Sequence, residues 1–363
     1  MRPWPLLLAL AVVSGSAAAQ TGHFDLKRPE IAKFMADFGA ANPQLAGTVR
    51  PILAEAVPQP KIIEAMNKPA EKALPWWQYR ARFLTPDRIE TGAALWRAHR
   101  ELLDDIALEH GVEPEYLVAI VGVETSFGRI TGRYRVLDAL ATLAFDYPQR
   151  SEFFRKELGE YLLLVGSDHL DPLHTQGSYA GAMGAAQFMP SSYRTYAVNE
   201  GHSAQRDLWN DWGDIFGSVA NYFQSHGWQY GAPVLQDATL AAGSAAPTPP
   251  ASVSLDDTLA TLAAKGITPV APPGAVAPPG AVAPATAAAN TGAAPPVIPP
   301  LATPPADTPA VLIAAPQESG DAWRIGYRNF YVITRYNRSP MYAMAVEELA
   351  QAVRQRVLED QNR

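Results

Sequence analysis

The sequence predicts a mainly helical (α+β) fold, with a Pro/Ala-rich insertion between two ordered parts. Apolar residues recur at helical spacing through most of residues 24–236, whereas the alternation typical of strands is scarce. Residues 266–306 contain no Asp, Glu, Lys or Arg, and sixteen of the 33 prolines lie between Pro247 and Pro309. Such a composition cannot bury enough side chain to offset the entropy of ordering, which predicts a disordered linker.

The amino terminus has the pattern of a secretory signal. Arg2 precedes an apolar run from Leu6 to Val13, and an Ala-x-Ala cleavage site ends at Ala19. We therefore expect residues 1–19 to be removed on export. No other stretch approaches the roughly 20 apolar residues of a membrane-spanning helix. Because the chain has no cysteine, we also expect no lipid anchor.

Composition excludes several classes of function. The absence of cysteine excludes disulfides, thiol nucleophiles and thiolate metal sites. The net charge of −7 argues against a nucleic-acid-binding protein. No His-x-x-x-His pair, Gly-x-Ser-x-Gly elbow or phosphate-binding glycine loop is present, which argues against zinc hydrolases, serine hydrolases and nucleotide-binding enzymes.

Helical periodicity, caps and breakers predict five main helices. They span residues 88–109, 114–127, 151–165 and 214–225, and the last begins at Ser339-Pro340. Residues 323–335, before the last helix, are aromatic and β-prone, so we expect a strand there.

Glu124 is the strongest candidate for chemistry. Pro114 suits the first turn of its helix, Gly128 suits the stop, and Leu117, Ile120 and Glu124 share one face. Because that face should point inward, burial would raise the pKa of the carboxyl, as a general acid at neutral pH requires. The alternative is a glutamate at a helix end that turns out to solvent.

A Gly/Ala-rich segment, residues 177–193, is the second candidate. Small residues allow a backbone to approach a ligand closely, and Ser178, Gln187 and Tyr193 offer hydrogen bonds and an aromatic face suited to sugars. A tightly packed turn before a helix explains the same pattern. A basic loop with a central glycine, residues 129–135, follows Glu124.

These segments together resemble the membrane-bound lytic transglycosylase B family of bacterial peptidoglycan-cleaving enzymes. The motifs are Glu-Thr-Ser-Phe-Gly at 124–128, residues 178–193, Gly-Ser-Val-Ala-Asn-Tyr-Phe at 217–223, and residues 329–339. The resemblance covers residues 24–236 and 320–358, on both sides of the insertion. It implies a lysozyme-like helical core with a small β element, in a soluble periplasmic member of the family.

The composition and the resemblance together predict a domain organisation. The leader pattern gives a signal peptide at 1–19, the resemblance gives a lysozyme-like catalytic domain at 20–236, and apolar residues indicate a small ordered segment at 237–268. A disordered linker at 269–309 follows, and residues 310–363 would pack back on the catalytic domain. A plain spacer is the favoured role of the linker, although cell-wall or partner binding stays open.

The resemblance further implies that Glu124 is the sole catalytic carboxylate. It would protonate the oxygen between N-acetylmuramic acid and N-acetylglucosamine. It would then deprotonate the muramoyl C6 hydroxyl, which attacks C1 and gives a 1,6-anhydro end. Ser178 would orient Glu124, and Arg150 would meet the carboxylates of the stem peptide. The implied residues of the sugar-binding cleft are Tyr79, Gln187, Phe188, Tyr222, Tyr336, Asn337 and Tyr342.

We expect no cofactor. Many relatives carry a calcium loop of EF-hand type, but the matching stretch at 199–210 is degenerate, with Asn199 and Ser203 at the first and third acidic positions. Tight calcium binding is therefore not expected. The implied partners are peptidoglycan glycan strands with stem peptides, and cell-wall synthases are plausible through the resemblance alone.

Two other functions remain open. A hydrolytic muramidase would use a water and a second carboxylate, and would leave a reducing end. A non-catalytic peptidoglycan-binding scaffold would be expected to have lost Glu124 or Ser178, and both are present.

Overall fold

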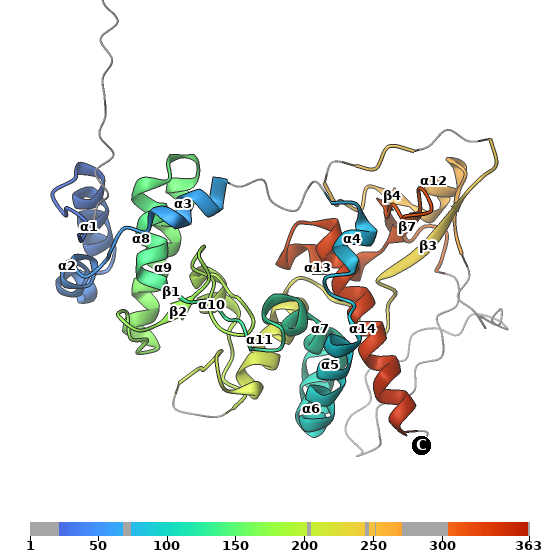
Figure 1. Ribbon diagram of the computed structural model, residues 1–363, viewed down its shortest axis with the longest axis horizontal. Coiled ribbons are helices and arrows are strands. Elements are labelled where there is room, and N and C mark those ends of the chain that lie inside the picture. The colour runs from blue at the N-terminus through green and yellow to red at the C-terminus, as the bar shows by residue number, and fades with distance from the viewer. Residues whose placement is uncertain are drawn as a thin grey trace, which may run out of the picture.

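The computed structural model describes residues 22–67, 74–201, 205–243, 247–250, 252–270 and 304–361 (Figure 1). The predicted signal at 1–19 and most of the predicted linker, 271–303, lie outside the described residues. Within the described part of the chain, no helix combines the length and apolar character needed to cross a membrane.

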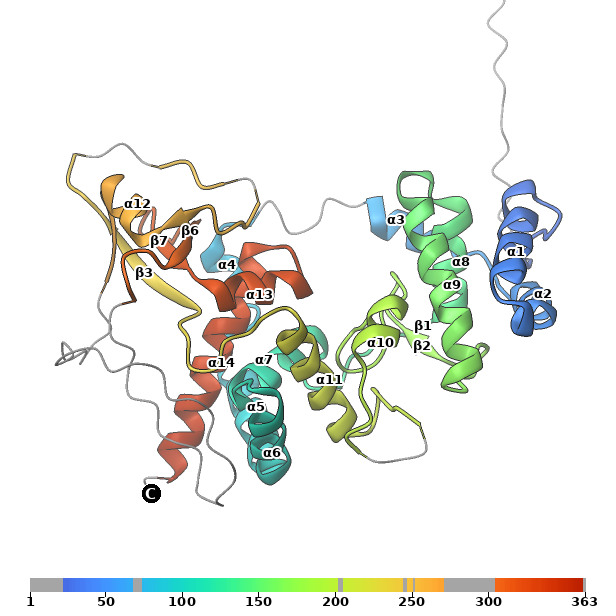
Figure 2. The same ribbon diagram turned by 180° about the vertical axis from the view of Figure 1, so that it is seen from behind.

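One end of the molecule is formed by helices from the first half of the chain (Figure 1). They are α1 (Pro29–Ala41), η1 (Pro43–Leu45), α2 (Ala46–Ala54), α3 (Pro60–Asn67), α8 (Val136–Asp146), η3 (Pro148–Arg150) and α9 (Ser151–Ser167). Helices α8 and α9 pack closely against each other. In both views α10 (Pro190–Tyr196) lies between this group and α11 (Trp212–Ser225) (Figures 1 and 2).

The central helices form a group that contains α7 (Pro114–Thr125). They are α4 (Trp76–Arg80), α5 (Pro86–Ala98), α6 (Arg100–His110), α11, α13 (Arg328–Tyr336) and α14 (Pro340–Gln361). Helix α7 is buried without interruption from Glu115 to Gly122, because its sequence is apolar on every face from Leu117 to Gly122. It packs against α5, α11 and α14. The carboxyl-terminal helix is therefore part of the central core.

Two small sheets complete the fold. Strands β1 (Tyr134–Arg135) and β2 (Gln176–Gly177) pair antiparallel, with Tyr134 opposite Gly177. The second sheet has the order β4-β6-β7-β3-β5, and every pair in it is antiparallel. Its strands are β3 (Leu235–Leu240), β4 (Asp257–Thr258), β5 (Ile267–Pro269), β6 (Pro309–Ala314) and β7 (Trp323–Gly326), and α12 (Leu259–Ala264) follows β4. Strands from before and after residues 271–303 thus share one sheet.

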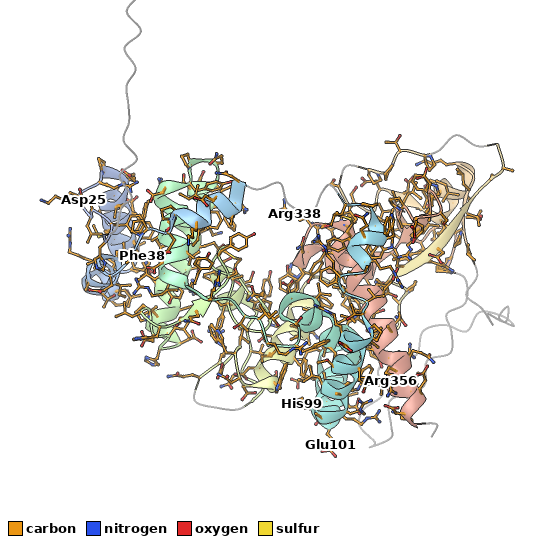
Figure 3. The ribbon with its side chains drawn as sticks, in the orientation of Figure 1. Asp25, Phe38, His99, Glu101, Arg338 and Arg356 are labelled. Carbon is orange, nitrogen blue, oxygen red and sulfur yellow. The ribbon has the colours of Figure 1, made fainter. Side chains whose placement is uncertain are left out.

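Two of the predicted elements are wrong in detail. The helix expected at 88–109 is two helices that meet at His99 (Figure 3). The His99 ring packs on Trp212 and Phe216 of α11. The strand expected at 323–335 ends at Gly326, and α13 follows it. Packing overrides β-propensity in α13, because Phe330 and Ile333 lie on one face and are fully buried.

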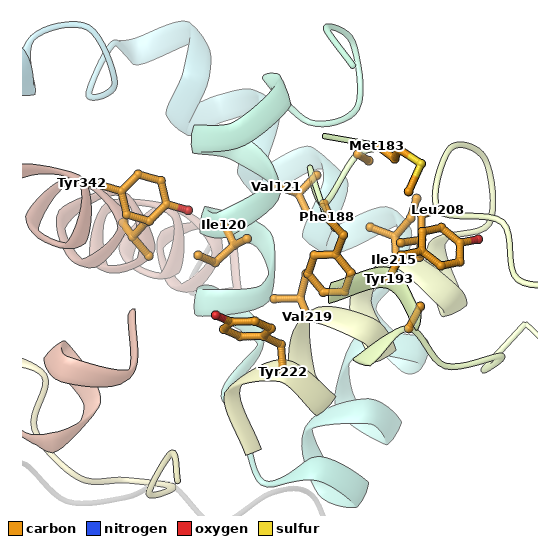
Figure 4. Packing of buried hydrophobic residues seen from close by; sticks show 14 of the residues in the cluster. Ile120, Val121, Met183, Phe188, Tyr193, Leu208, Ile215, Val219, Tyr222 and Tyr342 are labelled. Atoms are coloured by element: carbon orange, nitrogen blue, oxygen red, sulfur yellow. The ribbon is translucent and has the colours of Figure 1, made fainter. Parts of the chain in front are cut away.

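The core is continuous from α1 to α14. Figure 4 shows its centre, where Ile120 and Val121 of α7 meet Phe188, Tyr222 and Tyr342. Side chains from segments more than two hundred residues apart in sequence therefore pack in one cluster, and this cluster supports the candidate site.

Candidate active site

Glu124 lies in the last turn of α7. The chain leaves the helix through three residues with positive φ: Ser126 at 51°, Phe127 at 63° and Gly128 at 77°. The hydroxyl of Thr125 donates to the carbonyl of Ala185 over 2.9 Å and accepts from the amide of Gly128. The end of α7 is thereby tied to the Gly/Ala-rich segment.

The carboxyl group of Glu124 is held by one hydroxyl. Tyr342, at the start of α14, donates to Glu124 Oε1 over 2.6 Å. Burial raises the pKa of Glu124 to about 7, and the Tyr342 hydrogen bond opposes this rise because it favours the charged form. Burial and the nearby Glu124 charge raise the pKa of Tyr342, so its hydroxyl remains a donor. A carboxyl with a pKa near 7 can both give and take a proton at neutral pH.

Aromatic side chains form one side of the site. The rings of Tyr222 and Tyr336 meet edge to face at 4.9 Å, and Phe188 lies 5.8 Å from each. The Tyr222 hydroxyl donates to the carbonyl of Arg335, and the Tyr336 hydroxyl donates to the carbonyl of Ala186. These bonds fix both rings, and Phe188 and Tyr222 are buried beneath the site.

The Gly/Ala-rich segment folds tightly against the basic loop. Gln187, with φ 51°, donates from Nε2 to the carbonyls of Thr131 and Gly184. At Gly132, with φ 108°, a Cβ would lie 2.0 Å from the carbonyl oxygen of Gly177. Only glycine fits this crossing, so the two segments are held at a fixed distance.

Ser178 lies in this segment but bonds to backbone. Its Oγ accepts from the amides of Ala182 at 3.0 Å and Ala180 at 3.3 Å. The hydrogen bond to Glu124 comes instead from Tyr342. Orientation of Glu124 by Ser178 therefore stays a prediction.

The other predicted residues lie further out. Tyr79 is buried in α4 with its ring 5.1 Å from Phe83. Asn337 is exposed at the end of α13, where its Oδ1 accepts from the amide of Ser339. Arg150 is exposed before α9, and its guanidinium lies 4.5 Å above the ring of Phe153. The structure thus brings Glu124 together with the tyrosines of α11, α13 and α14, and it places Arg150 in the other helical group.

The carboxylates around the degenerate calcium loop already accept backbone hydrogen bonds. Buried Asp214 accepts from the amides of Gly201 and Asp207 over 2.9 and 2.7 Å. Asp207 accepts from the amides of Trp209 and Asn210. Residues 202–204 of the loop lie outside the described residues. A calcium ion here would have to compete with these bonds for the same oxygens.

Sequence reasoning missed two further carboxyl groups whose pKa is raised to about 7. Burial raises the pKa of Glu115 and of Glu347 to about 7. Both lie near the start of α7, where the Tyr116 hydroxyl donates to Glu347 Oε2 over 2.8 Å. Glu115 could have been found from its place in the first turn of an apolar helix. The partnership of Tyr116 with Glu347 spans 231 residues and has no local signal.

The family follows from a comparison with known proteins. The sequence model of the family described as "Transglycosylase SLT domain" matches residues 27–351. The chain belongs to this family. The family prediction made from the motifs is thus confirmed.

A curated relative and three solved structures extend this result. The chain is 41% identical over 278 residues to membrane-bound lytic murein transglycosylase B of Escherichia coli (strain K12), covering 77% of this chain and 67% of the relative. It is similar to the soluble lytic transglycosylase SltB1 of Pseudomonas aeruginosa, with a TM-score of 0.77 and 38% identity over 90% of this chain and 99% of SltB1.

The calcium complex of the Escherichia coli lytic transglycosylase Slt35 matches with a TM-score of 0.76 and 34% identity, over 93% of this chain and 96% of that one. SltB3 of Pseudomonas aeruginosa, in complex with NAG-anhNAM-pentapeptide, matches with a TM-score of 0.70 and 27% identity, over 89% and 78%. The predicted mainly helical fold of this transglycosylase family is confirmed.

Proposed function

We propose that the protein is a lytic transglycosylase that cleaves the β-1,4 bond between N-acetylmuramic acid and N-acetylglucosamine in peptidoglycan. The observation that carries this proposal is a single carboxyl group, Glu124, whose pKa is raised to about 7 at the surface of Tyr222, Tyr336 and Tyr342. The membership of the chain in a transglycosylase family supports it.

Glu124 serves as acid and then as base. In its protonated form it gives a proton to the glycosidic oxygen as the bond to C1 breaks. The resulting carboxylate takes the proton of the muramoyl C6 hydroxyl, whose oxygen bonds to C1 and closes the 1,6-anhydro ring. Tyr342 stabilises the carboxylate between the two steps, because its hydroxyl donates to Oε1.

Intramolecular attack suits a site with one candidate carboxyl group. Burial and the Tyr342 hydroxyl account for the raised pKa of Glu124. A hydrolase needs a second carboxylate about 5–9.5 Å away to act as nucleophile or to activate water. An attacking hydroxyl within the substrate removes that need and gains from proximity.

Complexes of a relative support the substrate and the product. SltB3 has been solved with NAG-NAM-pentapeptide and with NAG-anhNAM-pentapeptide. We propose the same substrate class for this chain, with Arg150 meeting a stem-peptide carboxylate and Gln187, Phe188 and Asn337 lining the glycan path together with Tyr79. Ser178 helps to orient Glu124 through its hydroxyl proton, which its two backbone bonds leave free to donate.

The remaining proposals concern location and organisation. Export to the periplasm after removal of residues 1–19 fits a peptidoglycan substrate. The reaction needs no cofactor, and we propose no tight calcium site at 199–210. Pairing of β3 with β7 across the insertion supports one catalytic unit formed by residues 20–236, 237–268 and 310–363, with the linker as a spacer. Cell-wall synthases remain partners predicted from the resemblance.

Mass spectrometry of muropeptides released from purified peptidoglycan tests the function. Products lighter by one water than hydrolytic products are expected. Reducing-end products would identify a muramidase and require a second carboxylate. Binding to peptidoglycan without release of products would identify a scaffold.

A further inference from the structure

A nitrogen ligand and two carboxylates meet away from the active site. Glu109 and His110 end α6, and Glu200 lies in the loop that precedes α11. One potential ligand atom from each of the three residues lies within 4.8 Å of the others. We propose that Glu109, His110 and Glu200 form a binding site for a divalent transition-metal ion of the Zn²⁺ class.

The distance between His110 and Glu200 favours a metal over a simple ion pair. His110 Nε2 lies 3.4 Å from Glu200 Oε1. Charge-assisted hydrogen bonds are usually about 2.7–2.9 Å long. In tetrahedral zinc sites the ligand bonds are about 2.0–2.2 Å, so neighbouring ligand atoms lie about 3.4 Å apart. The observed separation corresponds to one edge of such a tetrahedron.

A second contact of His110 bears on which nitrogen of its imidazole carries the proton. His110 Nδ1 lies 3.3 Å from Gln224 Oε1 of α11, and an amide oxygen can only accept. In the tautomer that donates from Nδ1 to Gln224, Nε2 presents its lone pair to the Glu200 carboxylate. Metal-binding histidines are oriented in this way by a hydrogen bond from their other nitrogen. In that tautomer two electron-pair donors face each other, and a cation bound between them would satisfy both.

The backbone around Glu200 is shaped to hold its side chain in place. A Cβ at Gly217 would lie 2.2 Å from Glu200 Cγ, so the side chain of Glu200 occupies the space that this glycine leaves. Gly217 and Gln224 are seven residues apart on α11 and thus share a face. The amide of Gly201 donates to buried Asp214, which fixes the chain next to Glu200. One face of α11 therefore supports both Glu200 and His110.

The donor set indicates the class of metal. One imidazole and two carboxylates suit zinc and neighbouring transition metals, whereas calcium takes six to eight oxygen ligands. His110 is 9% exposed and Glu109 is exposed, so the site opens to solvent on the Glu109 side. The ion would join α6 to the loop before α11, and would act as a structural clamp away from Glu124.

Titration of the untagged, chelator-treated protein with Zn²⁺ by calorimetry tests the proposal. We expect one Zn²⁺ per chain, and visible absorption of a four-coordinate site when Co²⁺ replaces it. Glu109→Gln removes an exposed ligand with little effect on packing, and should weaken Zn²⁺ binding at least about tenfold. Glu101→Gln, on the same helix and exposed (Figure 3), is the matched control and should bind like the wild type.

Glu200→Gln provides a second, independent variant. It should also weaken Zn²⁺ binding and reduce the rise in melting temperature that Zn²⁺ gives to the wild type. Absence of one-to-one binding, or wild-type binding by both Glu109→Gln and Glu200→Gln, would overturn the proposal. His110 and Glu200 would then be a structural pair without a metal.

Discussion

Replacement of Tyr342 by Phe isolates the hydrogen bond that holds the Glu124 carboxylate. Tyr342 donates to Glu124 Oε1 over 2.6 Å and lowers a pKa that burial raises to about 7. Hydrogen bonds to charged groups contribute about 1.5–3 kcal/mol, and one pKa unit corresponds to about 1.36 kcal/mol. Because the bond favours the charged form, its loss should raise the pKa of Glu124 by roughly one to two units.

The pH dependence of kcat/KM reports this change. The first step needs protonated Glu124, so activity falls as the pH rises through its pKa. In Tyr342→Phe this fall should move to higher pH by about one to two units, measured as initial rates on soluble glycan strands at low substrate concentration.

Tyr116→Phe is the matched control. It also removes a hydroxyl that donates to a glutamate of raised pKa, but its partner is Glu347. The activity profile of Tyr116→Phe should keep the wild-type position. Coincident profiles for Tyr342→Phe and the wild type, or an equal shift in both variants, would refute the role of Tyr342.

Three further changes test the site and its support. Glu124→Gln should fold normally and lose about 10²- to 10⁴-fold in muropeptide release; appreciable residual lysis would place the acid elsewhere. Gly132→Ala should destabilise the protein by roughly 2–4 kcal/mol, because its Cβ would clash with the Gly177 carbonyl at positive φ. Gly47→Ala is the control, because nothing lies within 4 Å of its added Cβ in α2, and it should melt at or slightly above the wild-type temperature. Equal losses of stability in Gly132→Ala and Gly47→Ala would refute the clash at Gly132. The pKa of Glu347 rises from 4.5 to about 7 on folding, so its contribution to stability is full below pH 4.5 and is lost as the pH rises through 7. Urea unfolding at pH 5 and at pH 8 measures this loss of stability. Glu347→Gln should reduce the loss by up to about 3 kcal/mol. An unchanged difference in unfolding free energy between the two pH values would show that Glu347 has an ordinary pKa.

Helices whose ends are determined by nearby capping or helix-breaking residues could be predicted from the sequence. Pro114 and Gly128 bracket α7, and Pro340 begins α14, as the capping rules require. The break at His99 has no such signal, because it depends on packing against Trp212 of α11. The helical state of α13 likewise depends on the core around Phe330.

In the candidate site, too, local features could be predicted from the sequence, whereas contacts between distant residues could not. The inward face of α7 was visible from periodicity, and with it the raised pKa of Glu124. The resemblance supplied Tyr342 as a residue of the cleft but not its hydrogen bond, which joins positions 218 residues apart. The contact of His110 with Glu200 spans 90 residues and was invisible to a search for close histidine pairs.

The placement of α14 makes the last part of the chain a condition for activity. Glu124 is made early in synthesis, but Tyr342 and the helix that covers α7 come only after the strands β6 and β7. A chain that stops after β7 would keep its acid and leave the apolar surface of α7 uncovered. On the proposed mechanism, a chain that lacks α14 should therefore be inactive although it keeps Glu124.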